Sequence, residues 1–235
     1  MVKKLFLTIL TLFLLYHSTK AQYEDFETWY NLTIKGEINK KWTYSLEPEL
    51  RFFENAGQLS NWQTEFSLSY DLPKKFDVGG IYRYAVNYEK QNYNRRIHRF
   101  AIFVKYQLKT GHFKWRYRGQ LQNEWVNYNT SADGQINYMG HRHKFALKYD
   151  DKDWYFEPSM GIEYYFSLMP AKDVGEWKQR YYVTVEKKIN KRTSAKVSYR
   201  RQSDFNVAEP DLVNVLFVGI EYKPKFLKHK KKNKK

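Results

Sequence analysis

A hydrophobic pattern with a period of two constrains this chain more than any other feature. Residues 42–53 read WTYSLEPELRFF, in which apolar side chains such as Trp42 and Leu50 alternate with charged ones such as Glu47 and Glu49. Successive side chains of a β-strand point to opposite faces, so this pattern predicts a strand that separates two different environments. In a soluble sandwich these are a core and water, and in a membrane barrel they are lipid and a polar lumen.

The same alternation continues along almost the whole chain after residue 25. Pro48 and Pro158 fall on its apolar face, where a local break is expected because proline cannot donate a backbone hydrogen bond. No linker separates segments of different kinds, which predicts a single domain. The segments expected as strands are residues 26–38, 42–53, 61–72, 76–88, 96–108, 113–125, 141–149, 154–166, 177–189, 193–205 and 212–222.

The connections between these segments alternate in length. Short turns are expected at residues 39–40, 73–75, 109–112, 150–153 and 190–191, and longer links at 54–60, 89–95, 126–140, 167–176 and 206–211. This is the plan of a transmembrane β-barrel with short periplasmic turns and longer extracellular loops. Bacterial barrels have even strand numbers, so the eleven segments leave ten, eleven or twelve strands open, with residues 26–38 the uncertain member.

Composition agrees with a barrel and not with helical membrane spans. The mean hydropathy of −0.79 is too polar for such helices, while an aromatic content of 19% is too high for a disordered chain. Strands that alternate between lipid and a polar lumen combine the two properties. The chain has no cysteine, which excludes disulfides, thiolate metal sites and lipidated cysteine anchors.

The first residues predict export from the cytoplasm. Lys3 and Lys4 precede an apolar run at residues 5–16, and the small residues Thr19 and Ala21 end the segment. A basic start, a short apolar run and such a site are typical of a secretory signal peptide. We therefore expect a signal peptide at residues 1–21 and a barrel at residues 22–223.

The net charge of +16 would by itself suggest nucleic acid, but export argues against that partner. Much of the charge lies in the last stretch, KPKFLKHKKKNKK. We expect residues 224–235 to form a solvated basic periplasmic tail, with contact to an anionic surface as the less favoured alternative.

Tryptophan positions give an independent test of the barrel. One set lies on the apolar face beside the short turns and a second beside the longer links, which predicts two aromatic girdles. Only Trp29 breaks the rule, because it falls on the polar face. The two sets are Trp42, Trp115 and Trp154, and Trp62, Trp125 and Trp177.

Several stretches carry a resemblance to a known family: NKKWTYSLEPELRFF, SYDLPKKFDVGGIYRY, RRIHRF, WRYRGQLQNEW, FEPSMGIEYYF and WKQRYYVTV. Over nearly the whole mature chain they resemble domain of unknown function 2490 (DUF2490), a family of outer-membrane barrels of Gram-negative bacteria. The resemblance implies a membrane barrel and supplies no reaction. Residues 219–222, GIEY, are similar to the final-strand signal read by the barrel-insertion machinery, although a lysine tail follows them.

Charged side chains on the polar face are the candidate functional residues. We expect them to pair and stiffen the barrel, and the alternative is a pore constriction whose basic excess favours anions. A barrel of this size is close to one that side chains can fill, so both remain open. Those expected near mid-height of the lumen are Glu47, Glu49, Glu65, Arg83, Arg99, Arg118, Arg142, Lys144, Arg180 and Arg200.

Enzyme chemistry is the less favoured alternative. Glu47 and Glu49 share a face, but ion pairing with arginine is expected rather than acid–base work. His141 and His143 also share a face and lack an evident third metal ligand. A lipase or deacylase would use a Ser–His pair on the barrel wall, for which the only candidates are His98 and Ser203, with no motif around either.

The sequence therefore predicts an all-β, integral outer-membrane barrel with no cofactor, in contact with membrane lipid and lipopolysaccharide. Its expected role is that of a structural barrel or a narrow passive channel with a basic lumen.

Overall fold

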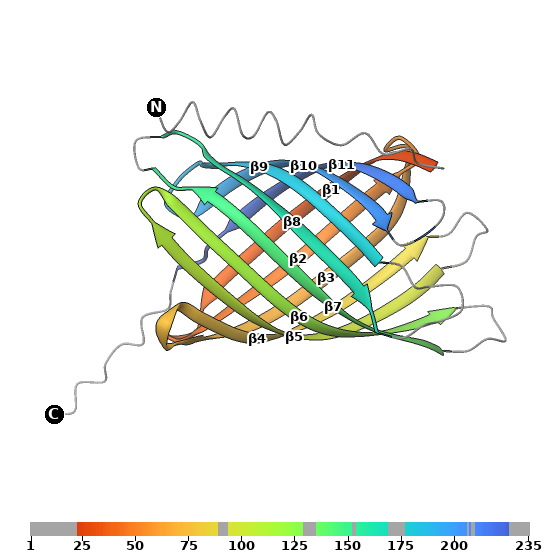
Figure 1. Cartoon of the computed structure of the whole chain (residues 1–235), viewed down its shortest axis with the longest axis horizontal. Coiled ribbons are helices and arrows are strands. Elements are labelled where there is room, and N and C mark those ends of the chain that lie inside the picture. Colours follow the sequence, from red (N-terminus) through yellow and green to blue (C-terminus); the bar gives the residue numbers. More distant parts are fainter. Residues whose placement is uncertain are drawn as a thin grey trace.

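The computed structural model describes residues 23–88, 94–128, 135–151, 154–168, 177–205, 207 and 210–225. These residues form one closed barrel of eleven strands (Figure 1). The expected fold, a single all-β barrel of up-and-down strands, is confirmed. The strands are β1 (Tyr23–Glu37), β2 (Trp42–Phe53), β3 (Gln58–Leu72), β4 (Phe76–Tyr88), β5 (Asn94–Thr110), β6 (Phe113–Tyr128), β7 (Gln135–Tyr149), β8 (Glu157–Ser167), β9 (Trp177–Lys188), β10 (Thr193–Phe205) and β11 (Asp211–Tyr222).

The predicted signal peptide, residues 1–21, lies outside the described residues, as does the basic tail from residue 226 onward. One short 3-10 helix, η1 (Pro73–Lys75), connects β3 and β4. In the described part of the chain, no helix has the length and apolarity that a membrane crossing requires.

The barrel closes through a parallel pair, β1 with β11. Consecutive strands pair antiparallel, whereas the register of the closing pair runs from Tyr23 opposite Asp211 to Ile34 opposite Tyr222. An odd number of up-and-down strands leaves the first and last strands pointing the same way, so the pair that closes the ring must be parallel. β1 also pairs with β2. It is therefore a full wall strand, which decides the strand count that the sequence left open.

The two faces of the wall differ as the alternation predicts. Outward positions expose apolar side chains, among them Ile102 at 65% and Phe100 at 52%. Inward positions hold buried polar ones, such as Gln63 at 6% and Gln120 at 5%. The polarity of a soluble protein is thus inverted, with apolar groups outside and polar groups inside.

Some predicted connections were wrong in their bounds. β8 begins at Glu157 and not at residue 154, so the link predicted at residues 150–153 extends to residue 156. The long link predicted at residues 126–140 shrinks to 129–134, because β6 and β7 continue further than their clearest alternation.

The link predicted at residues 54–60 is a tight turn at residues 54–57. Glu54, Asn55 and Ala56 all have positive φ, at 51°, 55° and 63°. The Asp25 carboxylate accepts hydrogen bonds from the backbone N–H groups of Glu54 and Asn55, both at 3.0 Å. The carboxylate of β1 therefore offsets the strain of this turn, a contact that local sequence does not reveal.

Pro48 breaks the ladder between β1 and β2, as predicted. Pairing runs down to Asn31 opposite Glu49 and resumes at Ile34 opposite Leu46. The Asn31 side chain donates to the Pro48 carbonyl at 3.4 Å and so partly replaces the missing contacts. Pro158 lies at the start of β8, where its pairing with β7 has already ended.

The parallel closure gives a test. Tyr30 and Val218 are opposite each other across β1 and β11, whereas Val197 lies one strand further on, opposite Val218. Because the chain has no native cysteine, we expect oxidation to cross-link Tyr30→Cys/Val218→Cys and to leave Tyr30→Cys/Val197→Cys open, since strands two apart are about 10 Å distant. Mobility of the denatured protein on a gel reports the link, and an unlinked first pair would contradict the eleven-stranded closure.

Candidate functional site: the polar lumen

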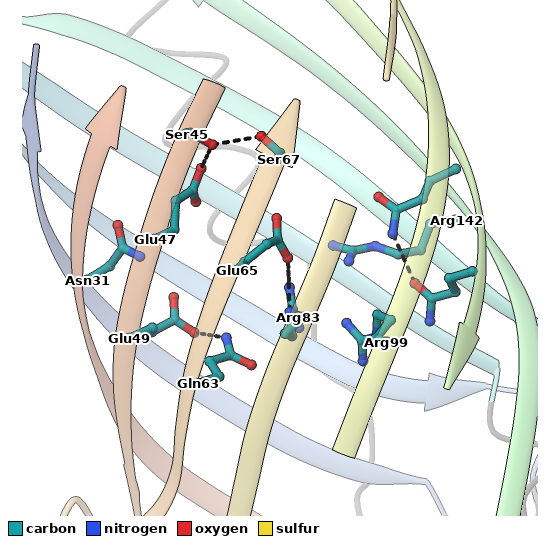
Figure 2. A network of polar contacts seen from close by, with 12 residues as sticks. Asn31, Ser45, Glu47, Glu49, Gln63, Glu65, Ser67, Arg83, Arg99 and Arg142 are labelled. Atoms are coloured by element: carbon teal, nitrogen blue, oxygen red, sulfur yellow. Dashed lines mark hydrogen bonds and ion pairs between the residues drawn. The ribbon is translucent and has the colours of Figure 1, made fainter. Parts of the chain in front are cut away.

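The charged residues predicted for mid-height of the lumen lie on the inner surface of the barrel. Along each strand they alternate with outward positions that carry the exposed apolar side chains. Figure 2 shows part of this set, with Glu47, Glu65 and Arg83 on the neighbouring strands β2, β3 and β4. The strands bring residues that are distant in the sequence into one polar network.

Glu163, in the middle of β8, is the carboxylate on which the lumen arginines converge. It accepts hydrogen bonds from Arg142 at 2.6 Å, Arg180 at 3.2 Å and Arg118 at 3.5 Å, and from the Tyr165 hydroxyl at 2.7 Å. Its exposed fraction is only 1%. A buried carboxylate is tolerated only when it is paired and hydrogen-bonded, so this contact ties β6, β7, β8 and β9 together.

Two further ion pairs cross neighbouring strands. Arg83 donates from Nε at 2.9 Å and from Nη2 at 2.5 Å to the same oxygen of Glu65 (Figure 2). Arg99 Nη2 lies 2.5 Å from Glu124 Oε1. All four side chains are largely buried, so the expected pairing of lumen charges is what the structure contains at these positions.

A chain of amides extends from Glu124 along β6. Gln122 donates to the Glu124 carboxylate at 3.1 Å, and Gln120 donates to the Gln122 carbonyl oxygen at 3.1 Å. Because a carboxylate only accepts, it fixes the direction of both amides. The carbonyl oxygen of Gln120 is left buried without a donor among the described residues.

The two carboxylates on β2 have different partners. Glu49 accepts from Arg51 Nε at 2.7 Å and from Gln63 at 2.6 Å. Glu47 accepts from the Ser45 hydroxyl at 2.9 Å (Figure 2). The pairing of Glu47 with an arginine was a wrong prediction, since none is found in the described part of the chain. Their separate partners also give no sign of a proton shared between Glu47 and Glu49.

Trp29, which broke the tryptophan pattern, lies inside the lumen with an exposed fraction of 3%. The guanidinium of Arg51 lies 3.7 Å from its ring centre, and those of Arg180 and Arg200 lie at 5.0 and 5.3 Å. Its indole N–H donates to Glu27 at 2.5 Å. Beside it, β11 contributes inward apolar side chains that pack with the indole, namely Val213, Val215 and Phe217. Where β1 meets β11, the lumen therefore contains a buried indole ring in contact with guanidinium groups.

Several lumen cations, among them Lys105, Lys144 and Arg200, have no carboxylate at ion-pair distance among the described residues. Aromatic rings face them instead: Lys105 is 4.2 Å from the ring centre of Phe103, Lys144 is 4.7 Å from Tyr182, and Arg200 is 3.7 Å from Phe217. At these three positions an aromatic ring takes the place of an ion pair.

Sequence reasoning missed the two members that organise this network, Glu163 and Trp29. The sequence placed Glu163 on the polar face without distinguishing it from its neighbours. Its central role can be recognised only from the strand register, which sets it opposite both Lys144 and Arg180. Trp29 did give a signal, because it was the one tryptophan on the polar face. Arg51 and Glu124 were likewise missed as partners of Glu49 and Arg99.

The tryptophans expected in the girdles are on the outer side. Trp42 and Trp115 are exposed at 37% and 52%. Trp62, Trp125 and Trp177 contact outward rings of the neighbouring strands. Trp154 precedes β8 and does not lie on a strand, and it packs against Tyr149 with ring centres 5.2 Å apart.

The histidines considered for catalysis lie on the outer wall. His141 Nδ1 is 3.0 Å from His143 Nε2, and the Tyr117 hydroxyl is 2.8 Å from His143 Nδ1. His98 lies on β5 and Ser203 on β10, two strands that are not neighbours in the barrel. Within the described ranges, no group of three or more His, Asp or Glu side chains is arranged to hold a metal ion.

Comparison with known proteins identifies one family. Residues 26–213 match the family described as "Protein of unknown function (DUF2490)". None of the curated proteins matches the chain. Among solved structures, the anion-selective porin from Comamonas acidovorans is similar, with a TM-score of 0.38 and 9% sequence identity over 78% of this chain. The chain spans 55% of that porin's length.

Removal of the central carboxylate tests the network. We expect Glu163→Gln to lower the free energy of unfolding by about 3–5 kcal/mol, because it leaves buried guanidinium groups short of an acceptor. Denaturant titration of the folded barrel in lipid vesicles measures this change. Glu65→Gln should act in the same direction through Arg83.

A matched control is Glu221→Gln, whose partner Lys223 has a side chain 58% exposed at the barrel rim. We expect a loss of less than about 1 kcal/mol there. If Glu163→Gln were no more destabilising than this control, the lumen charges would not be a packed, coupled network.

Proposed function

The chain belongs to DUF2490, a family of unknown function, so we propose its role from the barrel itself: an integral outer-membrane barrel whose lumen is closed by its own side chains. The observation that carries the proposal is the inverted distribution of polarity. Charged groups such as Glu163 are buried inside, while large apolar side chains cover the outside. Only a surrounding apolar solvent makes such an outer face favourable.

The dimensions of the wall support a membrane location. The shortest strand, β8, has 11 residues and the longest, β5, has 17. A tilted membrane strand needs about 9–11 residues, so every strand is long enough to cross. Closure through β1 and β11 also leaves no unpaired edge strand in the described ring, as a lipid environment requires.

The outer wall also carries shallow apolar hollows suited to acyl chains. One of about 440 Å³ lies beside Pro48 and is bordered by Tyr30, Leu50 and Trp62. A second of about 410 Å³ is bordered by Trp115 and Phe145 among others. Membrane lipid, including lipopolysaccharide, is the partner that this surface fits.

Burial of side chains at the centre of the lumen supports a closed barrel. Trp29, Glu163 and Arg142 have exposed fractions of 3%, 1% and 8%, so water has little access to them. They come from well-separated parts of the ring, and Arg180 connects them by contacting both Glu163 and the Trp29 ring. Small barrels are commonly filled by side chains in this way.

A narrow anion channel is the second candidate. The observation that favours it is the cationic excess at Lys105, Lys144 and Arg200, whose charges no acid at ion-pair distance offsets in the described residues. Such charge raises the local concentration of anions and repels cations. A lipase or deacylase reaction has weaker support, since His98 contacts Tyr82 and Ser203 contacts Gln179, on strands far apart in the ring.

Location is the first test. We expect cell fractionation to recover the protein in the outer membrane with an N-terminus at Gln22, as shown by mass spectrometry of the mature chain. An intact barrel should also migrate faster on a gel before heating than after it. Recovery as a soluble periplasmic protein would refute the membrane proposal.

Planar-bilayer recording separates the two lumen states. For a closed barrel we expect no steady conductance from the purified protein. Anion-selective steps that turn toward cations in Arg118→Glu would instead establish the channel, because that change reverses a charge on the lumen wall. Arg96→Glu, at an outward position on β5, is the control that should leave selectivity unchanged.

A further inference from the structure

Four lumen cations on β5, β6 and β7 form a group that we call the β5–β7 cation group: Lys105, Arg118, Arg142 and Lys144. Lys105, Arg118 and Lys144 are directly opposite one another on the three strands. Arg142 lies two positions before Lys144 and faces the same side. Like charges directly opposite one another destabilise a sheet, so this arrangement calls for a compensating negative charge.

The nearby acids do not supply enough of it. Glu163 is opposite Lys144, but it is also shared by Arg118, Arg142 and Arg180. Asp77 is opposite Lys105 and makes no ion pair with it. One oxygen of Glu65 already accepts from Nε and Nη2 of Arg83. Glu163 is therefore the one carboxylate at ion-pair distance from the group among the described residues.

The group also contains donors without acceptors. The Nε–H groups of Arg118 and Arg142 are buried and make no hydrogen bond in the described part of the chain. By contrast, Nε of Arg51 and Nε of Arg83 each donate to a glutamate, at 2.7 and 2.9 Å. A buried guanidinium N–H that lacks an acceptor is costly. Arg99, on the inward face of β5, also has a buried Nε–H without an acceptor among the described residues, so the missing acceptor lies along β5, β6 and β7.

One unpaired acceptor accompanies these donors. The carbonyl oxygen of Gln120 is buried without a donor, and Gln120 is opposite Arg142. Its amide cannot turn over, because its nitrogen is held by Gln122, which in turn is oriented by Glu124. The missing partner therefore needs several acceptor oxygens and one donor hydroxyl.

We propose that the β5–β7 cation group binds a hydrogen phosphate ion. Its oxygens accept from the guanidinium and ammonium groups, which are strong donors to oxyanions, and its hydroxyl donates to Gln120. Sulfate has the oxygens but is fully ionised near neutral pH and has no proton to donate. The inference rests on the proposed function, since it identifies what the closed lumen holds.

Thermal unfolding of the full folded protein in detergent tests the inference. At a fixed ionic strength maintained with chloride, inorganic phosphate at about 100 times its Kd should raise Tm by roughly 5 °C or more. Sulfate at the same concentration should raise it clearly less. No phosphate shift, or an equal shift with sulfate, overturns the proposal.

A pair of matched variants locates the site. Lys144→Gln removes one charge of the group, so we expect it to lose most of the phosphate-dependent rise while gaining stability in phosphate-free buffer. Lys196→Gln makes the same change at a lumen lysine on β10, which contacts Phe217 outside the group. It should keep the full rise, and equal rises in the two variants refute the site.

The outcome is separable from that of the proposed function. A silent bilayer without a phosphate shift removes the binding site and leaves the closed barrel standing. The opposite result is steady conductance together with a phosphate-dependent rise in Tm that Lys144→Gln abolishes. It would support the binding site and refute the closed lumen.

Discussion

Closure of the hydrogen-bond ladder is the constraint on which the rest of this structure depends. Eleven strands close only because β1 and β11 pair in parallel, and their contact gives every described strand two neighbours. A ring without edges satisfies its backbone groups internally, which permits an apolar outer surface. It also fixes the circumference of the lumen, and therefore how many inward side chains must share the space.

Because the inward side chains share this space, each buried charge in the lumen needs a nearby partner. Arginines from β6, β7 and β9 all reach one carboxylate, Glu163 on β8. Aromatic rings contact lumen cations that lack an ion pair, as Phe217 does at Arg200, and also paired ones, as Trp29 does at Arg51. The β5–β7 cation group has buried N–H groups that lack an acceptor among the described residues. The closed lumen and the anion site that we propose both depend on these buried cations.

The sequence predicted more of the wall than of its contents. Period-two alternation located every strand of the described barrel. The predicted bounds were wrong where the pattern weakens. Residues 154–156 were assigned to the strand that begins at Glu157, and β6 and β7 were predicted too short. The inward or outward direction of each side chain followed from the same pattern. Which inward charges meet did not follow: Glu47 was expected to pair with an arginine, and among the described residues it accepts from Ser45 instead.

The sequence by itself therefore determined the fold class and the two faces of the wall, because alternation and composition are local properties of the chain. Only the tertiary structure decided the strand count, the role of Glu163 and the burial of Trp29. The physical reason is that register and closure are long-range: Glu163 becomes a centre only when β8 is aligned with β7 and β9, and Trp29 is covered only when β11 returns to β1.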